Sequence, residues 1–153
     1  MNMDAQLIEH MMNPKNYGTL ESADVQGIGK NPENGEKVAI YLKVGKDEDQ
    51  PYVEDIRFQA IGCTTTVVAG SMLTEEAKDL NFNGVRNLID ATMKLLDRLP
   101  SEDAACSEMV ALAIKAAVDT YEKRQGDPDY PIITYKVVNS CVPKEEMKQE
   151  EEK

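Results

Sequence analysis

The stretch that decides the fold class is KVAIYLKVGKDEDQPYVEDIRFQA, residues Lys37 to Ala60. From Lys37 to Val44 apolar side chains occupy every second position, which is the pattern of a half-buried β-strand. The segment Tyr52 to Ala60 repeats this alternation, and the acidic stretch Gly45 to Pro51 between the two has the composition of a turn. Two alternating segments joined in this way predict an antiparallel hairpin.

The sequence after the hairpin has helical periodicity. Helices are predicted over Thr64–Leu80, Asn83–Ile89 and Asp90–Leu99, followed by an acidic connection at Ser101–Ala105. The last helix, Cys106–Tyr121, has the clearest pattern, because its apolar residues recur at 3.6-residue spacing over four turns.

The flanking segments complete the predicted fold. A short helix is expected at Asp4–Met12, then a glycine-rich loop with one short edge strand near Ala23–Ile28, and a final strand at Ile132–Val138. Strands followed by helices favour an α+β domain in which helices pack on one face of a small antiparallel sheet. We expect one domain over residues 1–143 and a charged, disordered tail over residues 144–153, which holds five Glu and three Lys.

Composition restricts the function. The net charge is -11, from 28 acidic and 17 basic residues, whereas nucleic-acid binding needs a positive face, so no nucleic-acid partner is expected. No apolar run approaches the roughly 18 residues of a membrane span, so no membrane partner is expected either. The first ten residues carry no Lys or Arg, unlike a targeting sequence, and a cytoplasmic location is expected.

The three cysteines are the candidate reactive groups: Cys63, Cys106 and Cys141. Cys63 follows a predicted strand and precedes a predicted helix, and the start of a helix stabilises the thiolate that binds metal or attacks sulfur. Cys106 has the same predicted position at the start of the last helix, but it also fits the apolar stripe of that helix. A buried structural role is the alternative for both residues. For Cys141, the alternative is an incidental thiol near the surface.

Four motifs together resemble the IscU/NifU N-terminal type of iron–sulfur cluster assembly scaffold. They are HMMNPKNYG (His10–Gly18), RFQAIGC (Arg57–Cys63), AGSMLT (Ala69–Thr74) and CSEMVALAIKAA (Cys106–Ala117). Their order and spacing agree with that family from His10 to Tyr121.

The resemblance implies a scaffold rather than an enzyme. Such a protein takes sulfur from a cysteine desulfurase, accepts iron, assembles a transient cluster, usually 2Fe-2S, and passes it to iron–sulfur apo-proteins. The residues that it implies as cluster or metal ligands are Cys63, Cys106 and Glu36. Thiolates suit this role because they are soft ligands that match iron and sulfide.

The chain also departs from the family pattern. Where the family has Cys-Gly-Asp, the sequence has Asn34-Gly35-Glu36, so the first cysteine is replaced by a residue that cannot supply a thiolate. Cys141, from the same chain or from a partner subunit, is the candidate replacement ligand. The family's chaperone-recognition stretch is reduced to Leu99-Pro100, which makes a dedicated chaperone partner doubtful.

Three hypotheses follow from this pattern. The first is a working scaffold with a modified ligand set. The second is a module that binds zinc, or accepts persulfide sulfur, without holding a cluster. The third is an adaptor that keeps only the fold and the partner surface. The sequence does not decide the oligomeric state and leaves a homo-oligomer open.

Overall fold

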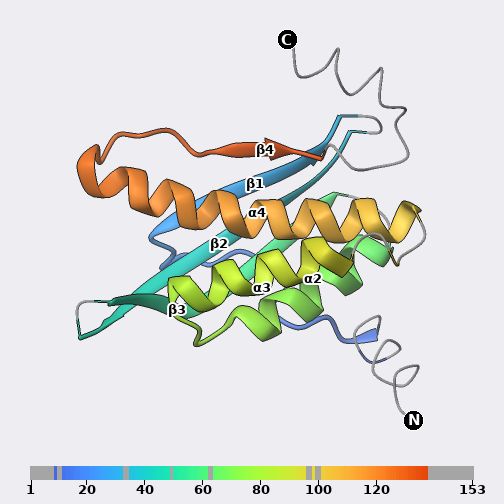
Figure 1. Ribbon diagram of the computed structural model, residues 1–153, viewed down its shortest axis with the longest axis horizontal. Coiled ribbons are helices and arrows are strands. Elements are labelled where there is room, and N and C mark those ends of the chain that lie inside the picture. The colour runs from blue at the N-terminus through green and yellow to red at the C-terminus, as the bar shows by residue number, and fades with distance from the viewer. Residues whose placement is uncertain are drawn as a thin grey trace.

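A computed structural model describes residues 9, 12–32, 35–48, 50–61, 64–95, 98 and 101–137. Figure 1 shows its elements, which follow one another along the chain as β1 (Val25–Asn31), β2 (Glu36–Asp47), β3 (Gln50–Ile61), α2 (Thr64–Ala77), α3 (Phe82–Leu95), α4 (Ser101–Gly126) and β4 (Thr134–Lys136). The α+β class is therefore confirmed. Most of the helix predicted at Asp4–Met12 lies outside the described residues.

The four strands form one sheet in the order β3-β2-β1-β4. The predicted hairpin is β2 and β3, which pair antiparallel with Ile40 opposite Phe58. The prediction of a purely antiparallel sheet was wrong, because β4 pairs parallel to β1 and the sheet is mixed. The edge position predicted for the first strand was also wrong, since β1 lies between β2 and β4.

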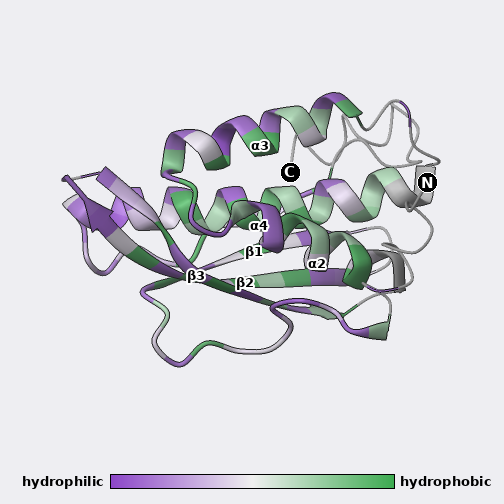
Figure 2. Cartoon of the chain, turned by 90° about the horizontal axis from the view of Figure 1, so that it is seen from below, coloured by the Kyte–Doolittle hydropathy of each residue, from purple (hydrophilic) through white to green (hydrophobic). Residues whose placement is uncertain are grey.

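The helices all lie on one face of the sheet, as predicted (Figure 2). Helices α2 and α4 lie closest to the strands, and α3 packs on α4 farther out with its polar face outward. Two glycines of β1 allow α4 to approach closely. A Cβ atom at Gly27 would lie 2.1 Å from the backbone nitrogen of Ala117, and one at Gly29 would lie 2.1 Å from the carbonyl oxygen of Met109.

The core fills the space between the sheet and these helices. Alternate residues of β2 and β3 point into it, and the stripe of α4 faces them. The largest fully buried side chains include Ile40, Leu42, Ile56, Phe58, Met109 and Ile114. Burial of such apolar side chains stabilises the fold by roughly 1.5–3 kcal/mol for each.

The segment before β1 closes the outer edge of β3. The amide of Gly18 donates to the carbonyl of Phe58 at 2.8 Å, and the amide of Phe58 donates to the carbonyl of Asn16 at 2.9 Å. Asn16 has a φ of 63°, a left-handed conformation that asparagine tolerates better than most residues. Its side-chain nitrogen donates to Thr74 Oγ1 of α2 at 3.1 Å. These bonds give Asn16 a structural role in fixing the N-terminal segment.

Two helices differ in extent from the prediction. The two short helices expected between Asn83 and Leu99 are one helix, α3, because nothing in the sequence breaks it at Asp90. Its N-terminus is capped two residues before Asn83, where Asn81 Oδ1 accepts a hydrogen bond of 2.7 Å from the amide of Gly84. The expected connection at Ser101–Ala105 is helical too, so α4 begins at Ser101. Acidic residues favour the first turn of a helix.

Candidate functional site

The first predicted site residue, Glu36, begins β2 and is half-buried. It pairs with Asn31, the last residue of β1, so it lies where the β1–β2 connection meets the sheet. Asn34, which the resemblance aligns with the family's first cysteine, lies within that connection but outside the described residues.

The second predicted site residue, Cys63, also lies outside the described residues, but the strand before it and the helix after it are described. Strand β3 ends at Ile61 and α2 begins at Thr64. Ile61 pairs with Lys37, the residue next to Glu36. The strand-to-helix junction predicted around Cys63 is therefore confirmed, and it lies at the same end of the sheet as Glu36.

Cys106 reaches this end of the domain from α4. Helix α4 runs antiparallel to β1, because Gly27 meets Ala117 while Gly29 meets Met109. Cys106 lies one turn before Met109, toward Asn31 and away from Gly27.

The structure corrects the prediction that Cys106 begins a helix. It lies in the second turn of α4, where the favourable field of the helix start has weakened. Its exposed fraction is only 5%, so the buried interpretation of this thiol is confirmed. A buried position does not exclude a ligand role.

Strand β4 runs toward the same end. It is parallel to β1, and the amide of Val137 donates to the carbonyl of Lys30 at 2.9 Å. Cys141 follows Val137 in the sequence but lies outside the described residues. Figure 1 shows the tip of β4, the end of β1, the start of β2 and the N-terminal ends of α2 and α4 toward the right.

Within the described part of the chain, no group of three or more His, Cys, Asp or Glu side chains is arranged to hold a metal ion. Of the predicted ligands, only Glu36 and Cys106 belong to that part. Sequence reasoning missed one charged group nearby: Glu108 is 1% exposed although it follows Cys106 by two positions. The apolar pattern of the surrounding helix was the available signal, because a helix buried on all sides must also bury its polar residues.

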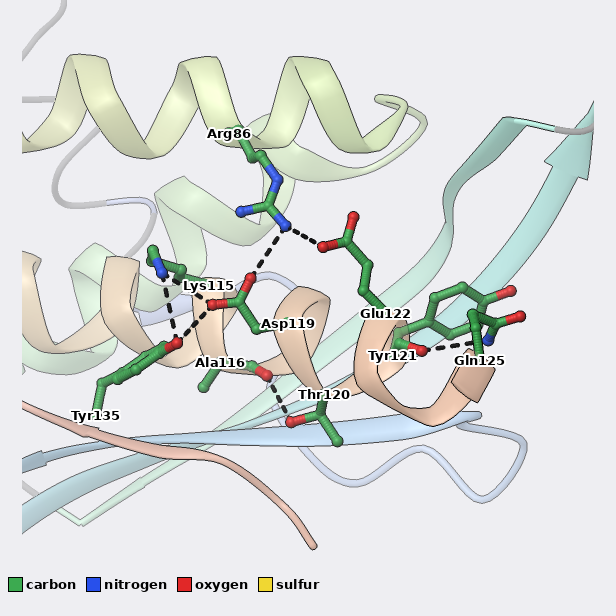
Figure 3. A network of polar contacts seen from close by, with 9 residues as sticks. All are labelled: Arg86, Lys115, Ala116, Asp119, Thr120, Tyr121, Glu122, Gln125 and Tyr135. Atoms are coloured by element: carbon green, nitrogen blue, oxygen red, sulfur yellow. Dashed lines mark hydrogen bonds and ion pairs between the residues drawn. The ribbon is translucent and has the colours of Figure 1, made fainter. Parts of the chain in front are cut away.

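An extended polar network lies far from Cys106, where α3, α4 and β4 meet (Figure 3). The carboxylate of Asp119 accepts hydrogen bonds from Arg86 at 3.0 Å, Lys115 at 2.8 Å and Tyr135 at 2.6 Å. The Lys115 ammonium also lies 4.6 Å from the centre of the Tyr135 ring. This network fastens β4 and α3 to the outer side of α4.

Charge and burial act in opposite directions on Asp119. Burial raises the pKa of its carboxyl, but the hydrogen bonds from Lys115, Tyr135 and Arg86 together outweigh burial and hold the pKa below its ordinary value. Burial and the bond to Asp119 both raise the pKa of Tyr135. At neutral pH the Asp119 carboxylate is therefore ionised and the Tyr135 hydroxyl keeps its proton. The network is stable in this state, which fits a structural role.

An open polar cavity of about 390 Å³ lies at the opposite end of the sheet from Glu36. Its lining residues are Lys46, Asp47, Gln50, Tyr52, Asp79 and Asn81. They include no thiol or imidazole, so this cavity does not have the ligand chemistry that the sequence predicts for the site.

None of the helices in the described residues combines the length and the apolar character that crossing a membrane requires.

Comparison with known proteins agrees with the fold and the sequence motifs. The family model of the NifU-like N terminal domain matches residues 2–128. The iron-sulfur cluster assembly scaffold protein IscU 1 of Archaeoglobus fulgidus is 36% identical over 124 residues, which cover 80% of this chain and 78% of that protein. The scaffold protein IscU of Aquifex aeolicus is 31% identical over 121 residues, which cover 78% and 76%.

A solved structure shows the same fold. The N-terminal part of a nitrogen-fixing NifU-like protein from Brucella abortus superposes with a TM-score of 0.64 at 14% identity, and the match covers 78% of this chain and 93% of that one. The sequence and structural matches agree, and the chain belongs to the family of the NifU-like N terminal domain.

Proposed function

We propose that this protein is a scaffold on which an iron–sulfur cluster, of the 2Fe-2S type, is assembled and from which it is transferred to apo-proteins. Its relatives from Archaeoglobus fulgidus and Aquifex aeolicus carry the name of scaffold proteins, which supports this role. Sulfur comes from a cysteine desulfurase and iron from solution or a carrier. The protein binds and releases this cargo and has no catalytic residues of its own.

The observation that carries the proposal is the convergence of three segments at one end of the domain. Glu36 begins β2, the residues that flank Cys63 end β3 and begin α2, and Cys106 lies in the second turn of α4. Two thiolates and a carboxylate form a set that accepts iron, because thiolates hold iron and sulfide while a carboxylate suits the harder iron cation. An incomplete set of protein ligands also favours release of the cluster.

The resemblance leaves this set one thiolate short, because Asn34 stands where the family has a cysteine. Cys141 is our proposed replacement. Val137 is bonded to Lys30 beside the end of β1, and four further residues span at most about 14 Å when extended. That reach is sufficient for Cys141 to approach the start of β2, in the same chain or in a second copy.

Anaerobic reconstitution with iron and sulfide tests the proposal. Visible absorption, iron content and sulfide content are measured for the wild type and for Cys63→Ser, Cys106→Ser, Cys141→Ser and Glu36→Gln. We expect a cluster in the wild type, and none in the Cys63→Ser and Cys141→Ser variants. Glu54→Gln is the matched carboxylate control, because its side chain is 45% exposed on β3 and pairs only with Lys43.

The burial of Cys106 and the asparagine at position 34 favour one alternative, a module that binds zinc or carries persulfide sulfur without a cluster. Cys63 would then act as the sulfur acceptor, with zinc held by the two thiolates and Glu36. Mass measurement after incubation with a cysteine desulfurase separates the two functions. An extra sulfur atom on the protein without cluster absorbance supports the alternative, whereas wild-type function in cells after replacement of both Cys63 and Cys106 by serine leaves only an adaptor role.

A further inference from the structure

Three lysines lie side by side on the face of the sheet that the helices leave uncovered. Lys30 of β1 pairs directly with Lys37 of β2, and its neighbour on the other side is Lys136 of β4. All three side chains are exposed, and each lies between residues that point into the core. We call this set the lysine row, and it crosses three strands beside the end where Glu36 begins β2.

Such an arrangement is unfavourable in the folded domain alone. Directly opposed side chains in an antiparallel pair lie about 4.5–5.5 Å apart at Cβ, and like charges at that distance destabilise the sheet. Two other lysines of the domain lie next to acids. Lys43 lies 3.5 Å from Glu54, and Lys78 lies 3.6 Å from Asp55. None of the three lysines of the row forms an ion pair with a residue in the described part of the chain.

This concentration of positive charge stands out because the protein as a whole carries a charge of -11. Five of the acids outside the described residues are concentrated in one place. Residues Glu145 to Glu152 read EEMKQEEE and hold five Glu and one Lys. The same chain therefore contains a cationic row on its sheet and an anionic segment after the sheet.

The connection between the two is short. Lys136 is the last residue of β4, and the amide of Val137 is bonded to the carbonyl of Lys30. The chain between Lys136 and Glu145 reaches about 30 Å when extended, whereas the row spans two strand spacings, about 10 Å. The acidic segment can therefore return to the row without strain.

We propose that the acidic segment Glu145–Glu152 binds the lysine row of its own chain. Short tethers give effective concentrations in the millimolar range, so weak contacts between exposed charges are sufficient for binding. The bound segment neutralises the repulsion among the lysines and covers the open sheet face beside Glu36. The proposal concerns the tail and the sheet only, and it is independent of whether a cluster forms.

Zero-length carbodiimide cross-linking of the full-length protein, followed by peptide mass mapping, tests the contact. We expect amide links between the row and Glu145–Glu152 at low salt, and at least a tenfold lower yield in about 1 M NaCl, where the screening length falls to about 3 Å. The matched control is Lys94, which is exposed on α3 on the helical side of the domain. Links to Lys94 in equal yield would overturn the proposal.

Mixing isotope-labelled and unlabelled protein identifies the source of the segment. In a link within one chain, both peptides are labelled or both are unlabelled, and that result supports the proposal. Links that join labelled to unlabelled peptides in the statistical ratio would assign the contact to a second copy and would overturn it.

A double-mutant cycle measured by thermal unfolding tests the same contact without chemical cross-linking. One change replaces Lys30, Lys37 and Lys136 by glutamine, and the other replaces the five Glu of the tail by glutamine. With the tail neutralised, loss of the row should raise Tm, because only repulsion is removed. With the native tail the gain should be smaller or reversed, and the difference should disappear in high salt. Equal Tm shifts with both tails would contradict the proposal.

Discussion

The hydroxyl of Tyr135 donates a hydrogen bond of 2.6 Å to Oδ2 of Asp119, and this bond joins the three-residue strand β4 to the longest helix of the domain. Asp119 also holds Arg86 of α3, so one carboxylate connects three elements that are distant in sequence. Its side chain is 15% exposed, which limits competition from water. Through Tyr135 and Arg86, Asp119 therefore ties β4 and α3 to α4, in addition to the backbone pairing of β4 with β1.

Replacement of Asp119 by asparagine should destabilise the protein by about 2 kcal/mol. The change keeps the size of the side chain but removes the charge that accepts three hydrogen bonds, and bonds to charged groups contribute about 1.5–3 kcal/mol each. Urea unfolding measures the loss. Glu122→Gln is the control, because that side chain is 51% exposed and its ion pair with Arg86 should contribute less than about 1 kcal/mol. Equal losses in the two variants would contradict this assignment.

The contribution of Asp119 should disappear in acid. Because its folded pKa lies below the ordinary value of 3.8, its ionised form stabilises the fold above that pH, and this stabilisation is lost as the pH falls through the folded pKa. The difference in unfolding free energy between the wild type and Asp119→Asn should stay constant from about pH 7 to about pH 5 and then shrink toward about pH 3. A difference that grows in acid would show that the folded pKa is raised instead.

Introducing a methyl group at Gly29 should be costly. Its Cβ would lie 2.1 Å from the Met109 carbonyl oxygen, so α4 would have to move away from β1. Gly29→Ala should therefore lower the free energy of unfolding by at least about 1–3 kcal/mol, the cost that is typical of overpacking. Gly126→Ala is the matched control, because nothing lies within 4 Å of the added atom and its stability should be unchanged or slightly higher. Denaturant midpoints of the two variants provide the comparison.

Replacement of Asn16 by alanine should lower the free energy of unfolding more than replacement by glycine. Alanine loses the bond to Thr74 and also strains the φ of 63°, whereas glycine loses only the bond. We expect a cost of about 1–3 kcal/mol for Asn16→Ala and a smaller one for Asn16→Gly. Hydrogen exchange of the Phe58 amide, which donates to Asn16, should accelerate in the same order. If both variants exchange equally fast, the backbone conformation does not contribute.

Cys106 should react slowly with thiol reagents in the folded protein. Its sulfur is buried with the residue 5% exposed, so alkylation needs opening of the start of α4. A variant in which Cys63 and Cys141 are serine isolates this thiol, and its maleimide reaction should be at least tenfold faster in urea than in buffer. A fast reaction in buffer would mean that the end of the domain opens readily.

The sequence was sufficient to predict the hairpin, the helical face and the family, because these depend on local alternation and on contiguous motifs. It was misleading at Gly29, because the strand expected near Ala23–Ile28 stopped before it in a glycine-rich loop, whereas β1 continues to Asn31. Gly29 lets α4 approach the backbone of that strand, and such a contact between distant segments leaves no local pattern. The parallel direction of β4 was not predictable for the same reason, since alternation is identical in parallel and antiparallel strands.

The candidate site was predictable in outline only. Periodicity correctly placed the junction between β3 and α2, and it placed the start of β2 within one residue of Glu36, whose role as a ligand stays a prediction. The start of α4 was predicted too late, because acidic residues suit both a connection and a first helical turn. The electrostatic argument for Cys106 therefore had to be replaced by one based on burial.

The parallel pairing of β1 with β4 has a consequence for the order in which the domain forms during synthesis. Ile28 is made early, but its strand partner Thr134 follows only after all three helices. Until then β1 keeps one edge open, and open strand edges invite pairing with other chains. Contacts so distant in sequence also slow folding. A nascent chain of this protein is therefore most prone to aggregation just before its final strand leaves the ribosome, and C-terminal truncations before Thr134 should be recovered mainly as insoluble protein.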